Sequence, residues 1–356
     1  MSKTNNPLAS FHEEALHDVD YTFAEAVQEA KRCLNCKVPQ CRKGCPIHNE
    51  IPQFIQALKE GNLGQAAEYI YHQSDLPAIC GRVCPREKQC EGACVLGKKG
   101  QHMEIGKLER FVADMAMNGG FLPLHVSKKT SGSVALIGSG PASIAAAREL
   151  ALRDYDVTIF EASSHAGGTT TYGIPTFRLH KEIVWREADM LEKMGVAIQY
   201  HTKIGTDKTI DELQQQFDAV FIGVGTMDAW SLGVANDTVE GVVNAEQFLV
   251  QVQNVQLGEE TIDNLPIQKG DQVIVVGAGN VAIDAARTAL RLGADVKIVY
   301  RRAEKNMKCL PSEYEEAKAD GVQFQFYSAP KAVVGTTHVE GLQYEKQQIL
   351  EDATMV

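Results

Sequence analysis

The chain has 356 residues, of which 44% are hydrophobic and 23% charged, and its formal net charge is −11. This mixture excludes a mainly disordered or fibrous protein, and the acidic balance argues against general nucleic-acid binding, which needs a basic surface. No run of about 18 or more apolar residues occurs and the N-terminus lacks an apolar signal core, so we expect a cytoplasmic protein of two or three domains without a membrane span.

Residues 1–117 are predicted to form a helical, cysteine-rich domain. Apolar residues recur at helical spacing in residues 23–33, 51–58 and 63–71, and glycines and prolines separate these segments. Residues 118–133 are rich in turn-forming and basic residues and are predicted to be a linker.

Eight of the nine cysteines lie in the N-terminal third of the chain. They are Cys33, Cys36, Cys41, Cys45, Cys80, Cys84, Cys90 and Cys94. Structural zinc sites usually pair two C-x2-C units, of which the chain has one. Bunched cysteines closed by Cys-Pro are typical of 4Fe–4S proteins, in which the last cysteine of a bunch often serves the other cluster. We therefore predict that these cysteines bind iron–sulfur clusters rather than zinc. Disulfides are also not expected, because a reducing cytoplasm disfavours them.

The spacing also suggests how the thiols are presented. Cys33 and Cys36 are about one helical turn apart, and Cys90 and Cys94 would share a face if their segment is helical. Cys309 stands alone and is expected to be an ordinary side chain.

A first glycine loop follows a predicted strand at residues 134–137 and precedes a predicted helix at 143–152. Its residues are Gly138, Ser139, Gly140, Pro141, Ala142 and Ser143. The glycines allow a pyrophosphate to approach a helix N-terminus. Glu161, at the end of the next strand (157–160), can accept hydrogen bonds from ribose hydroxyls. Gly167 and Gly168 follow, as in flavin-binding proteins of the disulfide-reductase type.

A second strand, loop and helix begin at residue 273. The loop consists of Gly277, Ala278, Gly279 and Asn280, and the helix is predicted at 281–292. The next strand, 296–300, is followed by Arg301 and Arg302 instead of an acid. Because guanidinium groups bind phosphate through charge-assisted bonds, this loop favours NADPH over NADH, and the first favours a flavin dinucleotide.

The expected fold is an α-helical iron–sulfur domain followed by an α/β flavoprotein with two dinucleotide-binding domains. We predict the FAD-binding domain at residues 134–240 and the NADPH-binding domain at 241–356.

In this order, the motifs resemble those of the small (beta) subunit of NADPH-dependent glutamate synthase, and of the related flavin half of dihydropyrimidine dehydrogenase. The segments that carry the resemblance are RCLNC, CRKGCP, LPAICGRVCP, CEGAC, IGKLERF, GSGPAS, YGIPTFRL, GAGNVAIDAARTALRLGA and YRR.

The resemblance implies two cluster sites. One would take Cys33, Cys36, Cys41 and Cys94, and the other would take Cys45, Cys84, Cys90 and Glu109. Counting cysteines alone offers Cys80 instead of Glu109, and both remain candidates for the fourth ligand of the second site.

The resemblance also implies nucleotide contacts. For FAD it adds Gly168, Thr169 and Arg178 to the first loop and Glu161. For NADPH it adds Lys308 to the second loop and the two arginines.

Three departures from the family pattern stand out. Three threonines ending at Thr171 replace the usual apolar residues after the double glycine, and His180 stands where proline is usual. The chain also ends at Val356 without the returning segment that completes the flavin domain in the family, so we expect that domain to lack its C-terminal part.

The expected function is that of an NADPH-oxidising electron-transfer flavoprotein. It would pass electrons through FAD and two 4Fe–4S clusters to a large glutamate synthase subunit in glutamate biosynthesis. Two alternatives remain: the equivalent part of a dihydropyrimidine dehydrogenase or ferredoxin-linked oxidoreductase, and a truncated, flavin-free iron–sulfur scaffold. No catalytic side chain is predicted, because the cofactors carry this chemistry.

Overall fold

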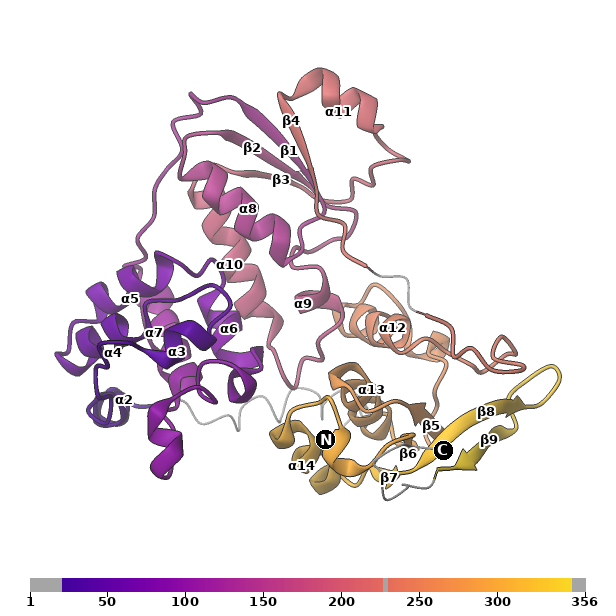
Figure 1. The fold of residues 1–356 in the computed structure, drawn as a ribbon. Coiled ribbons are helices and arrows are strands. Elements are labelled where there is room, and N and C mark those ends of the chain that lie inside the picture. The colour runs from indigo at the N-terminus through magenta and orange to yellow at the C-terminus, as the bar shows by residue number, and fades with distance from the viewer. Residues whose placement is uncertain (1–20, 227–229, 348–356) are drawn as a thin grey trace, which may run out of the picture. The chain divides into compact units, whose positions relative to one another are not determined.

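The computed structural model describes residues 21–226 and 230–347, which form two compact units (Figure 1). The described residues of the first unit are 21–171 and 178–225. Those of the second unit are 172–177, 226 and 230–347. The predicted boundaries at 117/118 and 133/134 both fall inside the first unit, which therefore contains the cysteine-rich segment and the first glycine loop.

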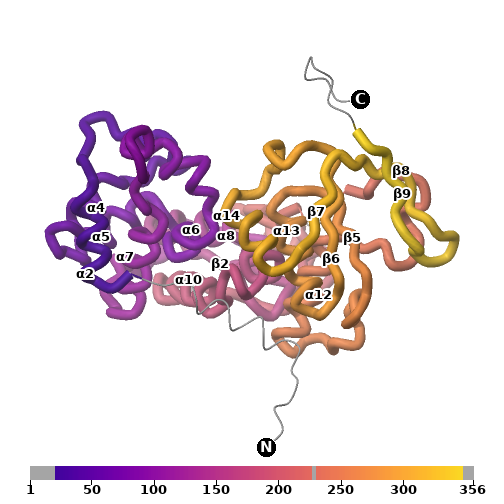
Figure 2. The backbone as a smooth tube through the Cα atoms, turned by 90° about the horizontal axis from the view of Figure 1, so that it is seen from below, coloured from indigo at the N-terminus to yellow at the C-terminus, as the bar shows by residue number. Residues whose placement is uncertain are grey.

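The N-terminal part of the first unit is helical, as predicted. Its elements are α2 (Phe23–Ala30), α3 (Gln40–Gly44), α4 (Ile51–Lys59), α5 (Leu63–Tyr71), α6 (Pro77–Val83), the 3-10 helices η2 (Arg86–Lys88) and η3 (Val95–Lys99), and α7 (Ile105–Gly119). The apolar faces of α4, α5 and α7 share one core, in which Phe54, Ile70 and Leu108 are fully buried. These helices lie together at the indigo end of the chain in both views (Figures 1 and 2).

Most of the clustered cysteines lie outside α-helices, which corrects two expectations. The helix predicted for residues 23–33 ends at Ala30, and Cys33 and Cys36 lie in the loop that follows. Cys90 and Cys94 lie in turns between η2 and η3, so they share no helix face. Glycines and prolines near these cysteines interrupt helical hydrogen bonding.

The remainder of the first unit is a parallel sheet with helices. Its elements are β1 (Ser133–Ile137), α8 (Pro141–Ala151), β2 (Asp156–Phe160), α9 (Thr169–Tyr172), α10 (Lys181–Lys193), β3 (Ala197–Gln199), α11 (Ile210–Gln216) and β4 (Ala219–Ile222). The strand order is β3-β2-β1-β4. The chain runs from β1 to β2 and β3 on one side of β1 and then crosses from β3 to β4 on the other side. A switch point therefore lies beside the carboxyl end of β1, where nucleotides bind in such folds.

The predicted linker is attached to this sheet domain. Ser127 donates its backbone N–H to Met194 O at 2.9 Å and its hydroxyl to Tyr155 O at 2.7 Å. The imidazole of His125 lies 2.8 Å from the Asp154 carboxylate. These contacts fix the segment without giving it regular secondary structure.

The second unit repeats the strand–loop–helix pattern. Its elements are α12 (Ala245–Leu257), η4 (Ile262–Asn264), β5 (Gln272–Val276), α13 (Asn280–Arg291), β6 (Asp295–Val299), η5 (Glu304–Asn306), α14 (Pro311–Asp320), β7 (Gln323–Gln325), β8 (Ser328–Val334) and β9 (Gly341–Lys346). The first sheet is parallel in the order β5-β6-β7, and β8 and β9 form an antiparallel pair. Figure 2 shows α13 close to α12 and to the strands of the parallel sheet, against which it packs.

Segment 172–177 contacts this unit through Thr176 and Phe177. The Thr176 hydroxyl donates to Gln256 Oε1 at 2.6 Å, on α12. The Phe177 ring lies 4.8 Å from the guanidinium carbon of Arg287 and 4.0 Å from that of Arg291, both on α13. Arg287 in turn pairs with Glu316 and Asp320 of α14. None of the helices in residues 21–226 and 230–347 has the length and apolar character that a membrane span needs.

Candidate functional site: cysteine pocket and glycine loops

Four cysteines of the first unit line one pocket. They are Cys33, Cys36, Cys41 and Cys94, the four that the family pattern groups together. The other walls are mostly apolar and include Ile55, Leu96 and Met103. The pocket thus joins thiols from the loop after α2, from α3 and from the turn before η3.

Four cysteines around one pocket match the ligand number of a 4Fe–4S cluster, because each of its irons takes its own thiolate. All nine cysteines are free thiols, so none is consumed in a disulfide.

Two of the pocket thiols have a raised pKa, and burial is the main cause. It raises the pKa of Cys41 to about 11 and also raises the pKa of Cys33. Iron coordinates thiolates, so loading this pocket must release protons.

The segments that carry the second predicted ligand set pack closely at two glycines. A Cβ on Gly44 would lie 2.7 Å from Gln89 O, and one on Gly81 would lie 2.7 Å from Arg110 N. The first approach brings the Cys45 turn against the Cys90 segment. The second brings α6, which ends just before Cys84, against α7 next to Glu109.

The electrostatics of this second group connect the predicted ligands. Burial raises the pKa of Cys84 to about 11, and the nearby Glu109 and Cys45 raise it further. Burial likewise raises the pKa of Cys90; the neighbouring Glu91 is the next cause, followed by Glu109, Cys84 and Cys45. Burial raises the pKa of the Glu109 carboxyl to about 7.

Cys80 lies near Glu109 and Cys84 of the same group. Burial is the main cause that raises the pKa of the Cys80 thiol, followed by the charges of Glu109 and Cys84. Glu109 and Cys80 are both close to Cys84, so both remain candidates for the fourth ligand.

Asn49 is a residue that the sequence analysis missed. It is 2% exposed, and its side-chain amide donates to Glu109 Oε1 at 3.1 Å. Its own Oδ1 accepts the backbone N–H of Glu50 at 2.8 Å, just before α4. In sequence an asparagine at this position indicates a helix cap, so nothing local pointed to its contact 60 residues away.

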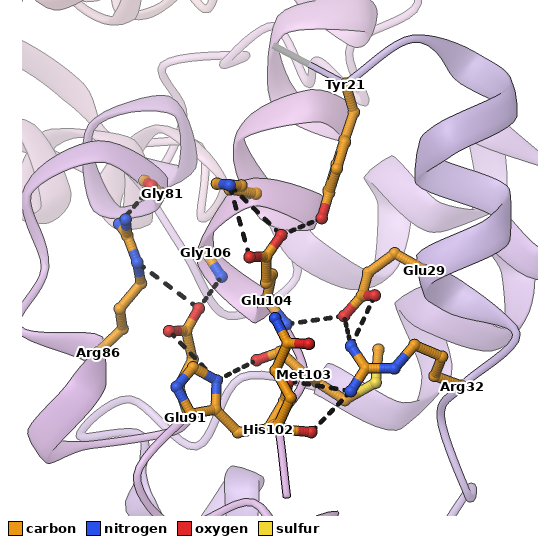
Figure 3. Close-up of polar contacts among 12 residues, drawn as sticks. Tyr21, Glu29, Arg32, Gly81, Arg86, Glu91, His102, Met103, Glu104 and Gly106 are labelled. Atoms are coloured by element: carbon orange, nitrogen blue, oxygen red, sulfur yellow. Dashed lines mark hydrogen bonds and ion pairs between the residues drawn. The ribbon is translucent and has the colours of Figure 1, made fainter. Parts of the chain in front are cut away.

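Figure 3 shows how polar contacts fix the segment that leads into α7. The Glu29 carboxylate accepts the backbone N–H of Glu104 at 3.0 Å and pairs with Arg32 at 2.7 Å. Arg32 also donates to the carbonyls of Gln101 at 2.6 Å and His102 at 3.3 Å. Since this segment contributes Met103 and Ile105 to the pocket, the network holds one wall in place.

A second carboxylate, Glu91, holds the start of α7 itself. It is 4% exposed, accepts the Gly106 N–H at 2.9 Å and lies 3.5 Å from Arg86 Nε (Figure 3). Glu91 follows Cys90 directly, so the same turn positions this predicted ligand and the helix that carries Glu109.

The first glycine loop has the expected form. β1 leads into Gly138, which has φ +86, and α8 begins at Pro141 with Gly140 as its N-cap. A Cβ on Gly138 would lie 2.7 Å from Gly223 O, and one on Gly168 would lie 2.9 Å from Gly140 Cα. The structure therefore brings Gly168 to the loop.

Polar groups at this loop fit a dinucleotide. Ser139 is fully buried, and its backbone N–H donates to the Glu161 carboxylate at 2.8 Å. Ser163 N donates to the same carboxylate at 2.8 Å, which fixes its orientation. The Ser143 hydroxyl is buried and has no hydrogen-bond partner among the described residues. The first N–H groups of α8 also point out of the helix, where an anion is favoured.

For two other predicted flavin residues, Thr169 and Arg178, the structure gives only their position in the chain. Thr169 follows Gly168 as the first residue of α9 and is exposed. Arg178 is the residue at which the chain returns to the first unit after segment 172–177. His180 has φ −57 at the N-cap of α10, a value that proline also adopts, which explains why it can replace the proline usual there.

The second glycine loop is formed in the same way. β5 leads into Gly277, with φ +123, and α13 begins at Asn280 after the N-cap Gly279. The backbone N–H of Lys308 donates to Ala278 O at 3.0 Å, so the structure brings Lys308 to the loop.

The two arginines lie just past the carboxyl end of β6. Arg301 is exposed and Arg302 half-buried. The preceding residue, Tyr300, donates its hydroxyl to Asn306 O at 2.7 Å, which closes the turn that carries them. Cys309 is 4% exposed and packs in the core of the second unit, as expected for an ordinary side chain.

Comparison with known proteins gives two family matches that together cover nearly the whole chain. Residues 10–121 match domain II of dihydropyrimidine dehydrogenase, a 4Fe–4S cluster domain. Residues 132–356 match the pyridine nucleotide-disulphide oxidoreductases.

Individual relatives agree with these matches. The chain is 35% identical to the NADPH glutamate synthase small chain of Escherichia coli over 93% of its length and 71% of that protein's. It is 36% identical to the beta subunit of an NADP-dependent formate dehydrogenase of Moorella thermoacetica, over 87% of its length and 46% of that subunit's. Mycobacterium tuberculosis FprA has a similar fold, with TM-score 0.52 and 19% identity over 63% of this chain and 65% of FprA.

These matches identify the chain as an oxidoreductase, with a 4Fe–4S cluster, FAD and NADPH as its cofactors. The chain belongs to the family of the NADPH glutamate synthase small chain, with a helical iron–sulfur domain followed by a flavoprotein fold of the pyridine nucleotide-disulphide oxidoreductase type.

Proposed function

We propose that this protein is an electron-input subunit that oxidises NADPH and delivers single electrons to a protein partner. The observation that carries the proposal is the pocket bordered by Cys33, Cys36, Cys41 and Cys94, in the same compact unit as the Gly138 loop. The bound cofactors supply hydride transfer from NADPH to flavin and one-electron transfer through the clusters.

The first unit is proposed to hold FAD at the Gly138 loop. The residues assigned to it are Ser139, Gly140, Pro141, Ala142, Ser143, Glu161, Gly168, Thr169 and Arg178. The N–H groups at the start of α8 would bind the pyrophosphate, and the Glu161 carboxylate, already oriented by Ser139 and Ser163, would accept from the ribose.

The second unit is proposed to hold NADPH at the Gly277 loop. The residues assigned to it are Gly277, Ala278, Gly279, Asn280, Arg301, Arg302 and Lys308. The exposed guanidinium of Arg301 and its neighbour Arg302 would bind the 2′-phosphate through charge-assisted hydrogen bonds, which supports NADPH rather than NADH.

The cysteine-rich domain is proposed to hold two clusters. The pocket supports the set Cys33, Cys36, Cys41 and Cys94. The packing at Gly44 and Gly81 and the shared electrostatics support the set Cys45, Cys84, Cys90 and Glu109.

The partner is proposed to be a large, glutamate synthase-like subunit, so that the electrons serve glutamate formation in the cytoplasm. Three relatives named as glutamate synthase small chains support this choice. The free state of all nine cysteines fits a reducing compartment. A further relative is named as the beta subunit of an NADP-dependent formate dehydrogenase, so a different partner is the alternative.

Anaerobic purification followed by iron, sulfide and flavin analysis tests the proposal. We expect about eight irons and one FAD per chain, and bleaching of the flavin absorbance when NADPH is added. About eight irons without FAD would instead favour a cluster scaffold. Zinc, or no metal, would overturn the cluster assignment.

A further inference from the structure

The surface around the cysteine pocket is charged oppositely to the chain as a whole. Residues 31–48 and 95–103 contain seven of the 35 Lys and Arg and none of the 46 Asp and Glu, although the net charge is −11. The seven are Lys31, Arg32, Lys37, Arg42, Lys43, Lys98 and Lys99. Both segments border the pocket, the first with three of its cysteines and the second with Val95, Leu96 and Met103.

Most of these cations are available to an external partner. Arg32 pairs with Glu29 at 2.7 Å, and Arg42 lies 4.0 Å from Glu50. The others are exposed and form no ion pair within residues 21–226 and 230–347; they are Lys31, Lys37, Lys43, Lys98 and Lys99.

Apolar side chains lie among these lysines. Leu34 is 62% exposed and Val38 is 58% exposed, and both belong to the loop between Cys33 and Cys41. Leu34 also lines the pocket. An apolar centre with a charged rim is typical of a surface that binds another protein. We call the five lysines together with Leu34 and Val38 the cationic face.

We propose that the cationic face is the docking surface for an acidic protein that carries its own one-electron redox centre. This inference rests on the proposed function. In the complete reaction one NADPH becomes NADP⁺ and H⁺, and its two electrons reduce two partner molecules by one electron each.

Distance and charge both favour this face. Electron transfer slows steeply with distance, and the cationic face surrounds the pocket assigned to one cluster. The remaining surface carries the chain's excess of acids and repels an acidic protein, so long-range attraction steers such a partner to the lysines. A basic partner would be directed away from the pocket.

The test compares two triple variants of the loaded, full chain with equal changes in charge. In the face variant Lys37, Lys43 and Lys98 become Glu. In the control variant Lys128, Lys193 and Lys203, exposed elsewhere on the first unit, become Glu. The probe is a plant-type 2Fe–2S ferredoxin, which is acidic, and the basic cytochrome c serves as the opposite-charge probe.

Two readouts separate this inference from the proposed function. Ferredoxin binding, followed by NMR titration at low ionic strength, needs no turnover. We expect the face variant to weaken it about tenfold or more and the control variant less than about threefold, and salt to weaken wild-type binding. We expect both variants to keep their iron and FAD. The face variant should bind cytochrome c at least as well as the wild type does. A further outcome would refute the proposed function alone. If wild-type protein binds ferredoxin and the face variant weakens that binding as expected, but NADPH does not reduce ferredoxin, the docking surface is still supported.

Equal weakening of ferredoxin binding by both variants would overturn the inference. Tighter ferredoxin binding after removal of residues 1–20 would also overturn the inference. The acidic residues of that segment would then be the occupant of the cationic face; they are Glu13, Glu14, Asp18 and Asp20. A salt-sensitive dimer of the chain that the face variant abolishes would assign the face to a second copy and also overturn it.

Discussion

The Glu187 carboxylate accepts a hydrogen bond of 3.1 Å from the backbone N–H of Ala78. Glu187 lies on α10 of the sheet domain, whereas Ala78 lies in the first turn of α6, which ends immediately before Cys84. A side chain of the flavin domain therefore holds the helix that leads into a proposed cluster ligand. This contact, between residues 109 positions apart, helps explain why the two segments form one unit.

Replacing Glu187 with Gln should change how stability depends on pH. Burial raises the pKa of Glu187 from its ordinary 4.5 to about 8. Between pH 4.5 and 8, the folded state therefore holds a proton that the unfolded state has lost. The stability present below pH 4.5 falls as the pH rises towards 8, by at most about 1.4 kcal/mol per pH unit. The E187Q variant should lose this slope.

Thermal midpoints at intervals from pH 5 to 8 measure the effect. The matched control is E182Q, on the same helix, whose side chain is 72% exposed. An E187Q slope equal to that of the wild type would show that Glu187 is ionised in the folded protein.

Removing Arg148 should destabilise the contact between the cysteine domain and the sheet domain. Arg148, on α8, is 6% exposed, pairs with Asp75 at 2.8 Å and donates to Tyr71 O at 2.6 Å. Arg148→Met leaves a carboxylate and a carbonyl unpaired, which costs about 2–4 kcal/mol. The thermal midpoint should fall by several degrees. Arg153→Met, at an exposed pair with Glu149, should lower it far less, and equal losses would contradict this role for Arg148.

Iron analysis of two single variants distinguishes the candidates for the fourth ligand of the second cluster. Glu109→Ala should lower the iron content from about eight to about four per chain, because one cluster loses a ligand. Cys80→Ala should retain about eight, since the family pattern assigns the fourth position to Glu109 and does not include Cys80 among the ligands. The reverse pattern would assign the site to Cys80, and retention of eight irons by both variants would require another ligand.

Removing the two arginines beyond β6 should weaken discrimination between the two nicotinamide nucleotides. The double variant Arg301→Ala/Arg302→Ala should raise the KM for NADPH about tenfold to a hundredfold, because each charge-assisted bond to phosphate contributes about 1.5 kcal/mol or more. The KM for NADH, which lacks the 2′-phosphate, should change little. Lys305→Ala, a nearby exposed cation, is the control, and a parallel loss with NADPH and NADH would mean that the arginines support the fold instead.

The sequence by itself determined the order of the domains and most of the element positions. The two strand–glycine–helix segments appear within one or two residues of their predicted bounds, since their apolar periodicity and glycines are local properties. The spacing of the cysteines likewise indicated iron–sulfur chemistry, because thiolate ligands must be close along at least part of the chain.

Only the tertiary structure decided how distant residues meet. The cysteine segment between η2 and η3 is a chain of turns, held by the buried carboxylate Glu91 and by packing at Gly44, so Cys90 and Cys94 share no helix face. Asn49 reaches Glu109, and Glu187 reaches Ala78, across 60 and 109 residues. Such contacts are fixed by the packing of whole helices, which no local pattern of residues encodes.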